Sequence, residues 1–335
     1  MTIVDALNRP LQNVRISVID QCNLRCTYCM PAEVFGRDYA FLPQNQLLTF
    51  EEIERLVKIF ASLGTEKIRL TGGEPLLRKG LPQLIEKLLK VEGIQDVSLT
   101  TNGILLGTYA EQLKNAGLKR INVSLDSLDS KTYGEMNGRN FPVEKVLRSI
   151  EKAAATGLHI KINMVVQKGI NEQDIIPMAK YCFEKGYTLR FIEYMDVGNT
   201  NRWNMAQVVP SQHILELLHK EMPVQPVVSN DNGEVAKRYK YVGTNKEIGF
   251  ISSVTEAFCS DCNRARISAD GKLYTCLFAT TGTDVKAILQ NQCDEEAKLQ
   301  LMNIWRYRHD RYSEERNTLN ETRSSNKIEM SYIGG

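Results

Sequence analysis

The chain has 335 residues, of which 42% are apolar and 24% charged, enough for one large or two ordinary domains with a sizeable core. A formal net charge of +2 argues against a strongly electrostatic nucleic-acid or membrane partner, although a local basic pocket stays possible. The N-terminus lacks a signal-peptide pattern, and no stretch approaches the roughly 20 apolar residues of a membrane-spanning helix. We therefore expect a cytoplasmic protein whose eight cysteines are metal ligands or reactive thiols rather than disulfides.

Short β-branched runs alternate with helical patterns through the first two-thirds of the chain. The clearest helical pattern starts with a capping box at Thr49 and Glu52 and ends at Gly64. Such alternation predicts a parallel sheet with right-handed crossovers, either doubly wound or an incomplete barrel of six units. Strands are expected at 14–20, 67–72, 96–103, 120–126, 159–166 and 188–195, and helices at 49–64, 81–91, 108–116, 143–156, 172–185 and 211–219.

Polar residues lie at the ends of these predicted strands: Asp20, 71–74, 100–102, Ser124, Asp126 and Glu193. In a barrel the strand ends line one face, which is where sites are built. Neither GxGxxG nor GxxxxGK[ST] accompanies the strands, so the dinucleotide and P-loop signatures are missing. A six-stranded barrel stays open at one side, and a further element is expected to cover the opening.

The periodicity weakens from about residue 226, and we predict two domains, 1–225 and 226–335. A hairpin is expected to turn at Asp270–Gly271. The stretch 299–317 is typical of a single charged helix. The chain ends in Gly334 and Gly335, which on its own indicates a frayed terminus.

Three cysteines, Cys22, Cys26 and Cys29, stand together directly after the first predicted strand. Thiolates are soft ligands that select zinc, Cu(I) or iron–sulfur clusters. A structural zinc site needs four ligands, and none of the four histidines is near this run. An iron–sulfur cube held by three cysteines keeps one iron open for a small molecule. The tight spacing disfavours three unconnected thiols.

A second set, Cys259, Cys262 and Cys276, has two and then thirteen residues between its members. Zinc with a fourth ligand elsewhere stays an alternative for this set. The two remaining cysteines fit neither set: Cys182 is expected in the core, and Cys293 in a loop or helix.

The first set resembles the CxxxCxxC signature of the radical S-adenosylmethionine enzymes, and Tyr28 before the third cysteine also fits. TGGEP at 71–75, after the second predicted strand, is similar to the motif that holds the methionine amino group in that superfamily. The resemblance implies an α/β fold of the incomplete, six-unit, TIM-like barrel type.

Three further stretches narrow the resemblance to one family within this superfamily. They are RISVIDQCNLRCTYCMP at 15–31, FCSDCNRARISADGKLYTCLF at 258–278 and the Gly-Gly end. Together they resemble the molybdenum cofactor biosynthesis protein A family, the GTP 3′,8-cyclases, nearly end to end. This implies that a smaller C-terminal domain closes the open side of the barrel. The family usually has threonine at Ile19 and arginine at Gln21; neither position supplies a ligand, so we expect activity to be kept.

The family resemblance implies two 4Fe-4S clusters, the first on Cys22, Cys26 and Cys29 and the second on Cys259, Cys262 and Cys276. The first would cleave S-adenosylmethionine reductively, and the resulting radical would take hydrogen from the 3′ carbon of GTP. Attack on guanine carbon 8 then gives (8S)-3′,8-cyclo-7,8-dihydroguanosine 5′-triphosphate, in the first step of molybdenum cofactor (molybdopterin) biosynthesis. The open iron of the second cluster would bind guanine.

The same resemblance assigns roles residue by residue. A triphosphate needs cations in a cleft, and arginine suits phosphate through its planar fork of donors. The implied S-adenosylmethionine contacts are Tyr28, Gly73, Ser124 and Met195; the GTP contacts are Arg15, Arg69, Thr100, Lys161, Arg264, Ala265 and Arg266; and the residues implied in catalysis are Arg15, Arg264, Arg266 and the tail glycines Gly334 and Gly335.

The implied partners are GTP, an electron donor such as flavodoxin or ferredoxin, and the downstream cyclic pyranopterin monophosphate synthase, with the chain a monomer or homodimer. Two alternatives stay open at this point. One is a two-cluster radical enzyme that modifies peptides, and the other is a zinc-bearing binding module without catalysis.

Overall fold

The structure is a computed structural model that describes residues 2–227, 233, 235–319 and 327–334. Within this described part, twelve strands form one sheet in the order β12-β11-β10-β1-β2-β3-β4-β5-β6-β9-β8-β7. The six central strands run parallel and are β1 (Asn13–Ser17), β2 (Lys67–Thr71), β3 (Asp96–Thr101), β4 (Arg120–Ser124), β5 (His159–Val166) and β6 (Thr188–Glu193). They confirm the six expected strands.

Strands from the last third of the chain extend this sheet at both edges. Beside β1 lie β10 (Arg264–Ile267), β11 (Lys272–Tyr274) and β12 (Thr283–Asp284), and beside β6 lie β9 (Glu247–Ile251), β8 (Lys237–Tyr241) and β7 (Val224–Pro226). The outermost strands of the described sheet, β12 and β7, do not pair with each other. The barrel is therefore incomplete, as predicted, while the boundary near residue 226 stays a prediction.

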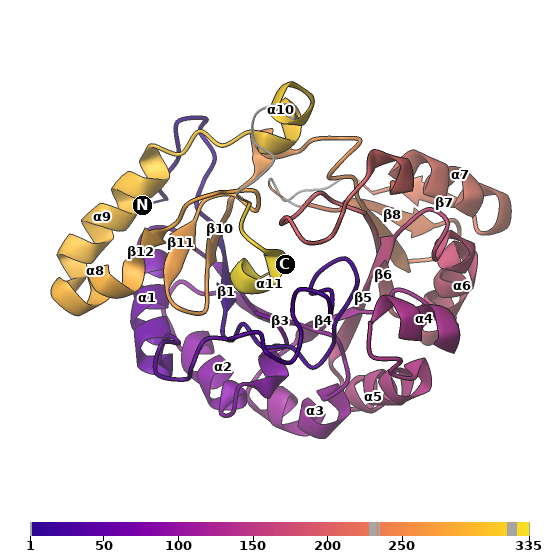
Figure 1. The fold of residues 1–335 in the computed structure, drawn as a ribbon, viewed down its shortest axis with the longest axis horizontal. Coiled ribbons are helices and arrows are strands. Elements are labelled where there is room, and N and C mark those ends of the chain that lie inside the picture. The colour runs from indigo at the N-terminus through magenta and orange to yellow at the C-terminus, as the bar shows by residue number, and fades with distance from the viewer. Residues whose placement is uncertain (1, 228–232, 234, 320–326, 335) are drawn as a thin grey trace.

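Helices cover the outer, convex side of the curved sheet, as Figure 1 shows. The capping box of the first helix is confirmed, since Glu52 N donates to Thr49 Oγ1 over 3.1 Å and Thr49 N to Glu52 Oε2 over 2.8 Å. The helices are α1 (Phe50–Ser62), α2 (Leu81–Leu89), α3 (Leu106–Asn115), α4 (Ser130–Met136), α5 (Val143–Ala155), α6 (Ile175–Lys185), α7 (Ser211–Glu221), α8 (Val285–Asn291), α9 (Asp294–Arg306), α10 (Tyr312–Leu319) and α11 (Met330–Ile333). Among these described helices, none has the length and apolar content needed to span a bilayer.

Alternation along the strands separates the core from the interior of the barrel. In β5, Ile160, Ile162 and Met164 are buried, while Lys161 and Asn163 between them are only partly buried. Successive strand residues point to opposite faces, so the apolar set packs under the helices and the polar set faces inward.

The strand register places three arginines side by side. Arg15 in β1 is paired with Arg266 of β10 on one side and with Arg69 of β2 on the other. The hairpin that carries Arg266 turns at Asp270–Gly271, as predicted, and Gly271 has a φ of +87°.

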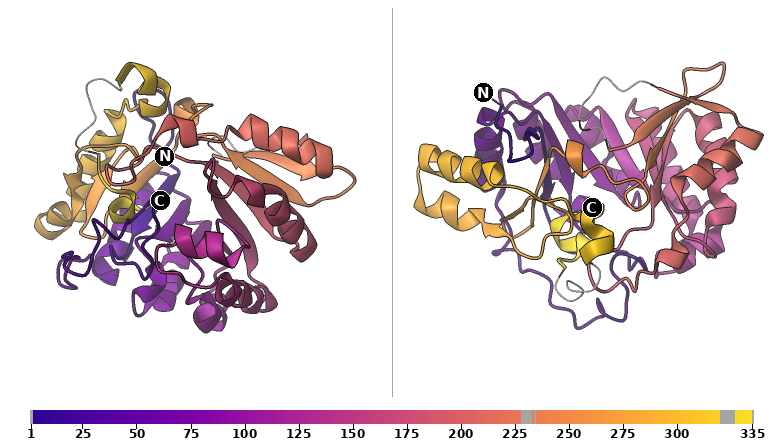
Figure 2. Two further views of the ribbon diagram at one scale, coloured as in Figure 1. Left: turned by 45° about the vertical axis from the view of Figure 1, so that its right-hand side comes forward. Right: turned by 90° about the horizontal axis from the view of Figure 1, so that it is seen from above.

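The C-terminal segment ends inside the curve of the sheet, seen from two further directions in Figure 2. Helix α11 packs against β1, and Ile333 is fully buried. An element from the C-terminal part therefore covers the barrel opening.

Candidate active site

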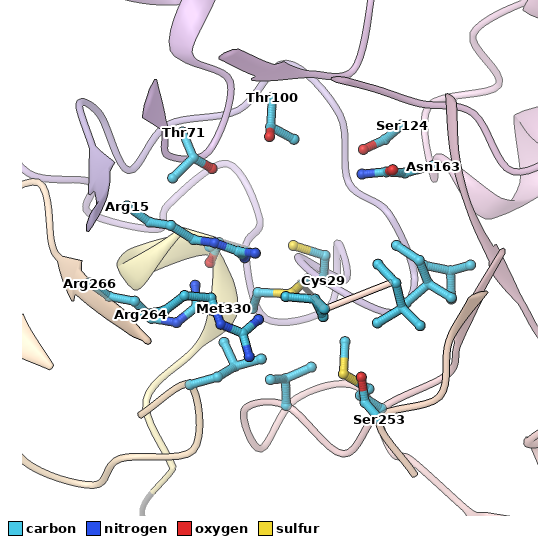
Figure 3. Close-up of a pocket in the computed structure, with 18 of the residues that line it drawn as sticks. Arg15, Cys29, Thr71, Thr100, Ser124, Asn163, Ser253, Arg264, Arg266 and Met330 are labelled. Atoms are coloured by element: carbon cyan, nitrogen blue, oxygen red, sulfur yellow. The ribbon is translucent and has the colours of Figure 1, made fainter. Parts of the chain in front are cut away.

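A cavity of about 270 Å³ lies inside the curve of the sheet (Figure 3). Its lining extends from Cys22 and Met195, which follow β1 and β6, to Cys262, which precedes β10. Figure 3 shows Arg15, Arg264 and Arg266 reaching into it from one side, with Ser124 and Asn163 on the other. Most of the residues proposed from the sequence line this cavity: Arg15, Tyr28, Arg69, Gly73, Thr100, Ser124, Met195, Arg264, Arg266 and the six cysteines of both sets.

The loop of the first cysteine set is wound so that its thiols face the cavity. The backbone N–H groups of Cys29 and Met30 both donate to the carbonyl of Cys26, over 3.0 and 2.9 Å. Leu24 N lies 3.4 Å from the sulfur of Cys22 and donates to it. A backbone N–H that donates to a cysteine sulfur, as Leu24 N does here, is typical around cluster thiolates.

The TGGEP segment is joined both to this loop and to the next strand. Glu74 is fully buried and accepts hydrogen bonds from Thr101 Oγ1 and Asn102 N, each over 2.7 Å. Burial raises the pKa of Glu74 to about 7. A Cβ added to Gly73 would lie 2.2 Å from the Gln21 carbonyl oxygen, so glycine here admits the backbone of the cluster loop itself. Sequence reasoning assigned this glycine only to a cofactor contact.

Tyr28 is oriented by Asp126, one of the polar residues at the predicted strand ends, to which the sequence gave no specific role. Asp126 Oδ2 accepts from the Tyr28 hydroxyl over 2.7 Å, and its Oδ1 accepts from Val165 N over 2.8 Å. Burial raises the pKa of Asp126 to about 6. Asp126 follows β4 and thereby fixes the tyrosine that precedes Cys29.

The second cysteine set lies across the cavity on the β10 side. Two guanidinium groups donate to the sulfur of Cys262, Arg308 over 3.3 Å and Arg264 over 3.4 Å. Burial alone would raise the pKa of Cys262, but these two cations lower it to about 6. The sulfur of Cys276 accepts from Phe278 N over 3.5 Å. The two guanidinium donors favour a thiolate at Cys262, whereas burial raises the pKa of Cys276 to about 12.

The chemistry of the two thiol triads fits iron–sulfur clusters, because each supplies three soft ligands to the cavity. Among the described residues, no three cysteine, histidine, aspartate or glutamate side chains are grouped to hold one ion. Burial, followed by the charge of Glu74, raises the pKa of Cys22 to about 11, and burial also raises those of Cys26 and Cys29. Cluster binding to this triad therefore releases protons.

The cavity concentrates the positive charge of several arginines. Burial first, and then the neighbouring Arg266 and Arg69, lower the pKa of Arg15 well below its usual value. Burial, Arg190 and Arg120 lower the pKa of Arg69 to about 9. Within the described part of the chain, the Nε atoms of Arg15, Arg69 and Arg264 are buried without a hydrogen-bond acceptor. Unpaired buried cations are costly, so the arrangement suits a polyanion.

Three residues implied by the resemblance lie elsewhere. Lys161 lines a second, smaller pocket with Thr188 and Arg238, and Arg190 lines both pockets. Ala265 is fully buried in β10, between Arg264 and Arg266. Gly335 lies outside the described residues.

The tail reaches the row of arginines. Arg266 Nη1 donates to the carbonyl oxygen of Gly334, and Met330 and Ser331 line the cavity. Gly334 has a φ of +74°, and a Cβ there would lie 2.2 Å from Thr71 Cγ2. A larger residue at this position would have to displace the side chain of Thr71.

Sequence reasoning gave no role to several polar cavity residues, among them Asn163, Arg190 and Arg308. Asn163 and Arg190 alternate with buried residues in β5 and β6, so strand periodicity was the available signal. Arg308 had no such signal, because it reaches Cys262 from a turn 46 residues away in sequence.

Comparison with known proteins decides the family. Residues 16–182 match the Radical SAM superfamily model, and residues 187–314 match Molybdenum Cofactor Synthesis C. Over 99% of its length the chain is 48% identical to proteins named GTP 3′,8-cyclase from Staphylococcus epidermidis and Staphylococcus aureus, and it covers 99% of each. The chain belongs to the GTP 3′,8-cyclase family. Members of this family use S-adenosylmethionine and two 4Fe-4S clusters, and membership sets aside the peptide-modifying and zinc-module alternatives.

Solved structures support the fold at much lower identity. The crystal structure of Streptococcus suis SuiB bound to S-adenosylmethionine has a TM-score of 0.62 at 15% identity, and the match covers 92% of this chain and 69% of that one. The anSMEcpe structure with bound AdoMet has a TM-score of 0.50 at 21% identity, covering 63% and 57%. These matches show that the chain shares its fold with these two structures.

Proposed function

We propose that this chain cyclises GTP to (8S)-3′,8-cyclo-7,8-dihydroguanosine 5′-triphosphate, the first step of molybdenum cofactor biosynthesis. The observation that carries the proposal is one cavity that joins two thiol triads to a row of arginines, two of which, Arg15 and Arg69, have a buried Nε without an acceptor among the described residues. A radical cofactor and a triphosphate substrate are the ligands that such a cavity suits.

On the side of the first triad, four residues would hold S-adenosylmethionine. Tyr28 is fixed by Asp126, Ser124 stands at the end of β4, and Met195 follows β6. Gly73 brings the TGGEP backbone against the cluster loop. These residues would orient the methionine, ribose and adenine parts, and the bound first cluster supplies the electron that cleaves the cofactor.

On the opposite side, the arginine row would bind and orient GTP. Arg15, Arg69 and Arg266 lie on three adjacent strands, and Arg264 stands beside the second triad. Thr100 Oγ1 is buried without a hydrogen-bond partner among the described residues and would contact the same substrate. Lys161 lines the adjoining pocket and would have to act on GTP from there. Arg190 lines both pockets and lies between them.

The tail would complete the site by excluding water. Met330 and Ser331 line the cavity, while Ile333 and Gly334 are buried against β1 and β2. Excluding water strengthens each electrostatic contact and protects a reactive intermediate. For Gly335, which follows Gly334 in the sequence, we propose the same role from the family resemblance alone.

The proposed reaction implies a reducing compartment and two protein partners. Six cluster thiols stay reduced in the cytoplasm, where we place the enzyme. An electron donor such as flavodoxin or ferredoxin would reduce the first cluster, and the cyclic pyranopterin monophosphate synthase would take the product.

The test is anaerobic incubation of the reconstituted protein with S-adenosylmethionine, dithionite and GTP. We expect 5′-deoxyadenosine and a cyclised nucleotide in equal amounts, measured by liquid chromatography and mass spectrometry. ATP in place of GTP should give no cyclised product. Cleavage of S-adenosylmethionine without any GTP product would refute the proposal while keeping the radical chemistry.

The buried Nε of Arg69, which has no acceptor among the described residues, predicts opposite effects of a substitution on protein stability and on GTP binding. Arg69→Gln should raise the melting temperature of the ligand-free protein by roughly 2–4 °C, because it removes a partly buried cation that Arg190 and Arg120 repel. The same change should weaken GTP binding about tenfold or more, measured by calorimetry.

Arg120→Gln is the matched control, since Arg120 forms a salt bridge with Asp96 and its loss should lower the melting temperature. A destabilised Arg69→Gln protein with unchanged GTP affinity would show that Arg69 is a structural residue.

A further inference from the structure

The C-terminal tail, residues 327–334, is held on both sides of the barrel opening. On the hairpin side, the hydroxyl of Tyr332 donates to Asp270 Oδ2 over 2.5 Å. On the β6 side, the tail contacts residues 196–200, which we call the β6 loop. The tail thus spans from the wall that carries Met195 to the hairpin that carries Arg266.

The contact with the β6 loop centres on the carboxylate of Glu329. One oxygen accepts from Asn199 N over 2.9 Å, and the other accepts from Thr200 Oγ1 over 3.0 Å. A Cβ built on Gly198 would lie 2.2 Å from Glu329 Oε2 and 2.8 Å from its Cδ. Gly198 therefore leaves open the space that the carboxylate fills.

A largely buried ion pair supports this contact. Lys327 Nζ donates to Asp196 Oδ2 over 2.8 Å and to the Asp196 carbonyl over 2.9 Å. The side chains of Lys327 and Asp196 are 13% and 8% exposed, so solvent weakens the pair little. Asp196 also accepts from Arg316 and Tyr312. The β6 loop is thus tied to the tail through several independent bonds.

We propose that Glu329 and the cradle at Gly198 are positioning residues for the cyclisation. They fix the position of the tail in the cavity. The positions of Met330, Ser331 and Gly334 relative to Arg266 therefore depend on them. Neither residue is assigned a contact with the reacting atoms. The inference rests on the proposed function, because the position of the tail affects product formation only if GTP reacts in this cavity.

The β6 loop begins directly after Met195, a proposed S-adenosylmethionine contact. The proposed cofactor contact at Met195 and the loop that binds the tail are therefore consecutive in the chain. A shift of the tail should leave cofactor cleavage running but uncouple it from substrate cyclisation, because the misplaced tail no longer holds Arg266.

The test uses reconstituted Gly198→Ala, with Gly243→Ala as the matched control. Both glycines have positive φ, +70° and +76°, so the backbone strain is similar, but a Cβ at Gly243 meets nothing within 4 Å. We expect faster hydrogen exchange at the amides of Tyr332 and Ile333 in Gly198→Ala only. Both amides donate to the Glu329 carbonyl in the structure.

Product analysis accompanies the exchange measurement. In Gly198→Ala the ratio of 5′-deoxyadenosine to cyclised nucleotide should rise at least about tenfold, with unchanged iron content. Glu329→Ala, which keeps the wild-type loop, should behave alike. The double variant should be no worse than either single variant, because removal of the carboxylate makes room for the added methyl group.

Wild-type exchange at Tyr332 and Ile333 in Gly198→Ala, or additive effects in the double variant, would overturn the proposal. Failure of the proposed function is distinguishable, because wild-type protein would then form no cyclised nucleotide whatever the exchange rates show. Altered exchange with a normal product ratio would also overturn the positioning role, leaving only a structural contact.

Discussion

Cys22→Ser is expected to abolish cleavage of S-adenosylmethionine, whereas Cys276→Ser should keep cleavage and lose conversion of GTP. The two thiols line one cavity but belong to triads on opposite sides of it. Only the Cys22 triad adjoins Tyr28 and the TGGEP segment, where the cofactor would bind. The Cys276 triad adjoins Arg264, which belongs to the substrate side.

Iron content and 5′-deoxyadenosine yield measure this division of labour. The wild type should hold about eight irons per chain and each variant about half of that number. Cys293→Ser is the control: Cys293 is exposed at the N-cap of α9, where serine is a preferred residue, so no loss is expected. Identical behaviour of the two cluster variants would contradict separate roles.

Removing Gly334 and Gly335 should leave both clusters and uncoupled cofactor cleavage intact while cyclised product falls by at least about 100-fold. The Gly334 carbonyl accepts a hydrogen bond from Arg266, which is buried and lies beside Arg15 in the strand register. Without the tail end, Arg266 loses this fixed partner and water can reach the arginine row.

Gly334→Ala tests the same site without shortening the chain, because its methyl group would meet Thr71. Product and 5′-deoxyadenosine are quantified together, and the Gly243→Ala protein serves as the control. Full turnover by the truncated chain would show that the tail end is dispensable.

Sequence reasoning succeeded where the signal is local. The six core strands, the capping box at Thr49 and the turn at Asp270–Gly271 depend on residues a few positions apart. It failed at 299–317, where one helix was predicted. The structure has α9 and α10 instead, separated by a turn from which Arg308 bonds to Cys262 and to Asp5. Tertiary contacts from distant segments outweighed the local helical preference there.

The sequence by itself determined the chemistry of this protein: two trios of thiols, the TGGEP segment and a set of arginines in strand patterns. Their spacing reflects bonds made within a few residues, so it is legible in the chain. Only the tertiary structure decided that Arg266 stands beside Arg15, that Lys161 lies in an adjoining pocket, and that Glu329 fills the space left by Gly198. Such pairings join residues up to 251 positions apart, and the packing of the whole chain, not any local preference, fixes them.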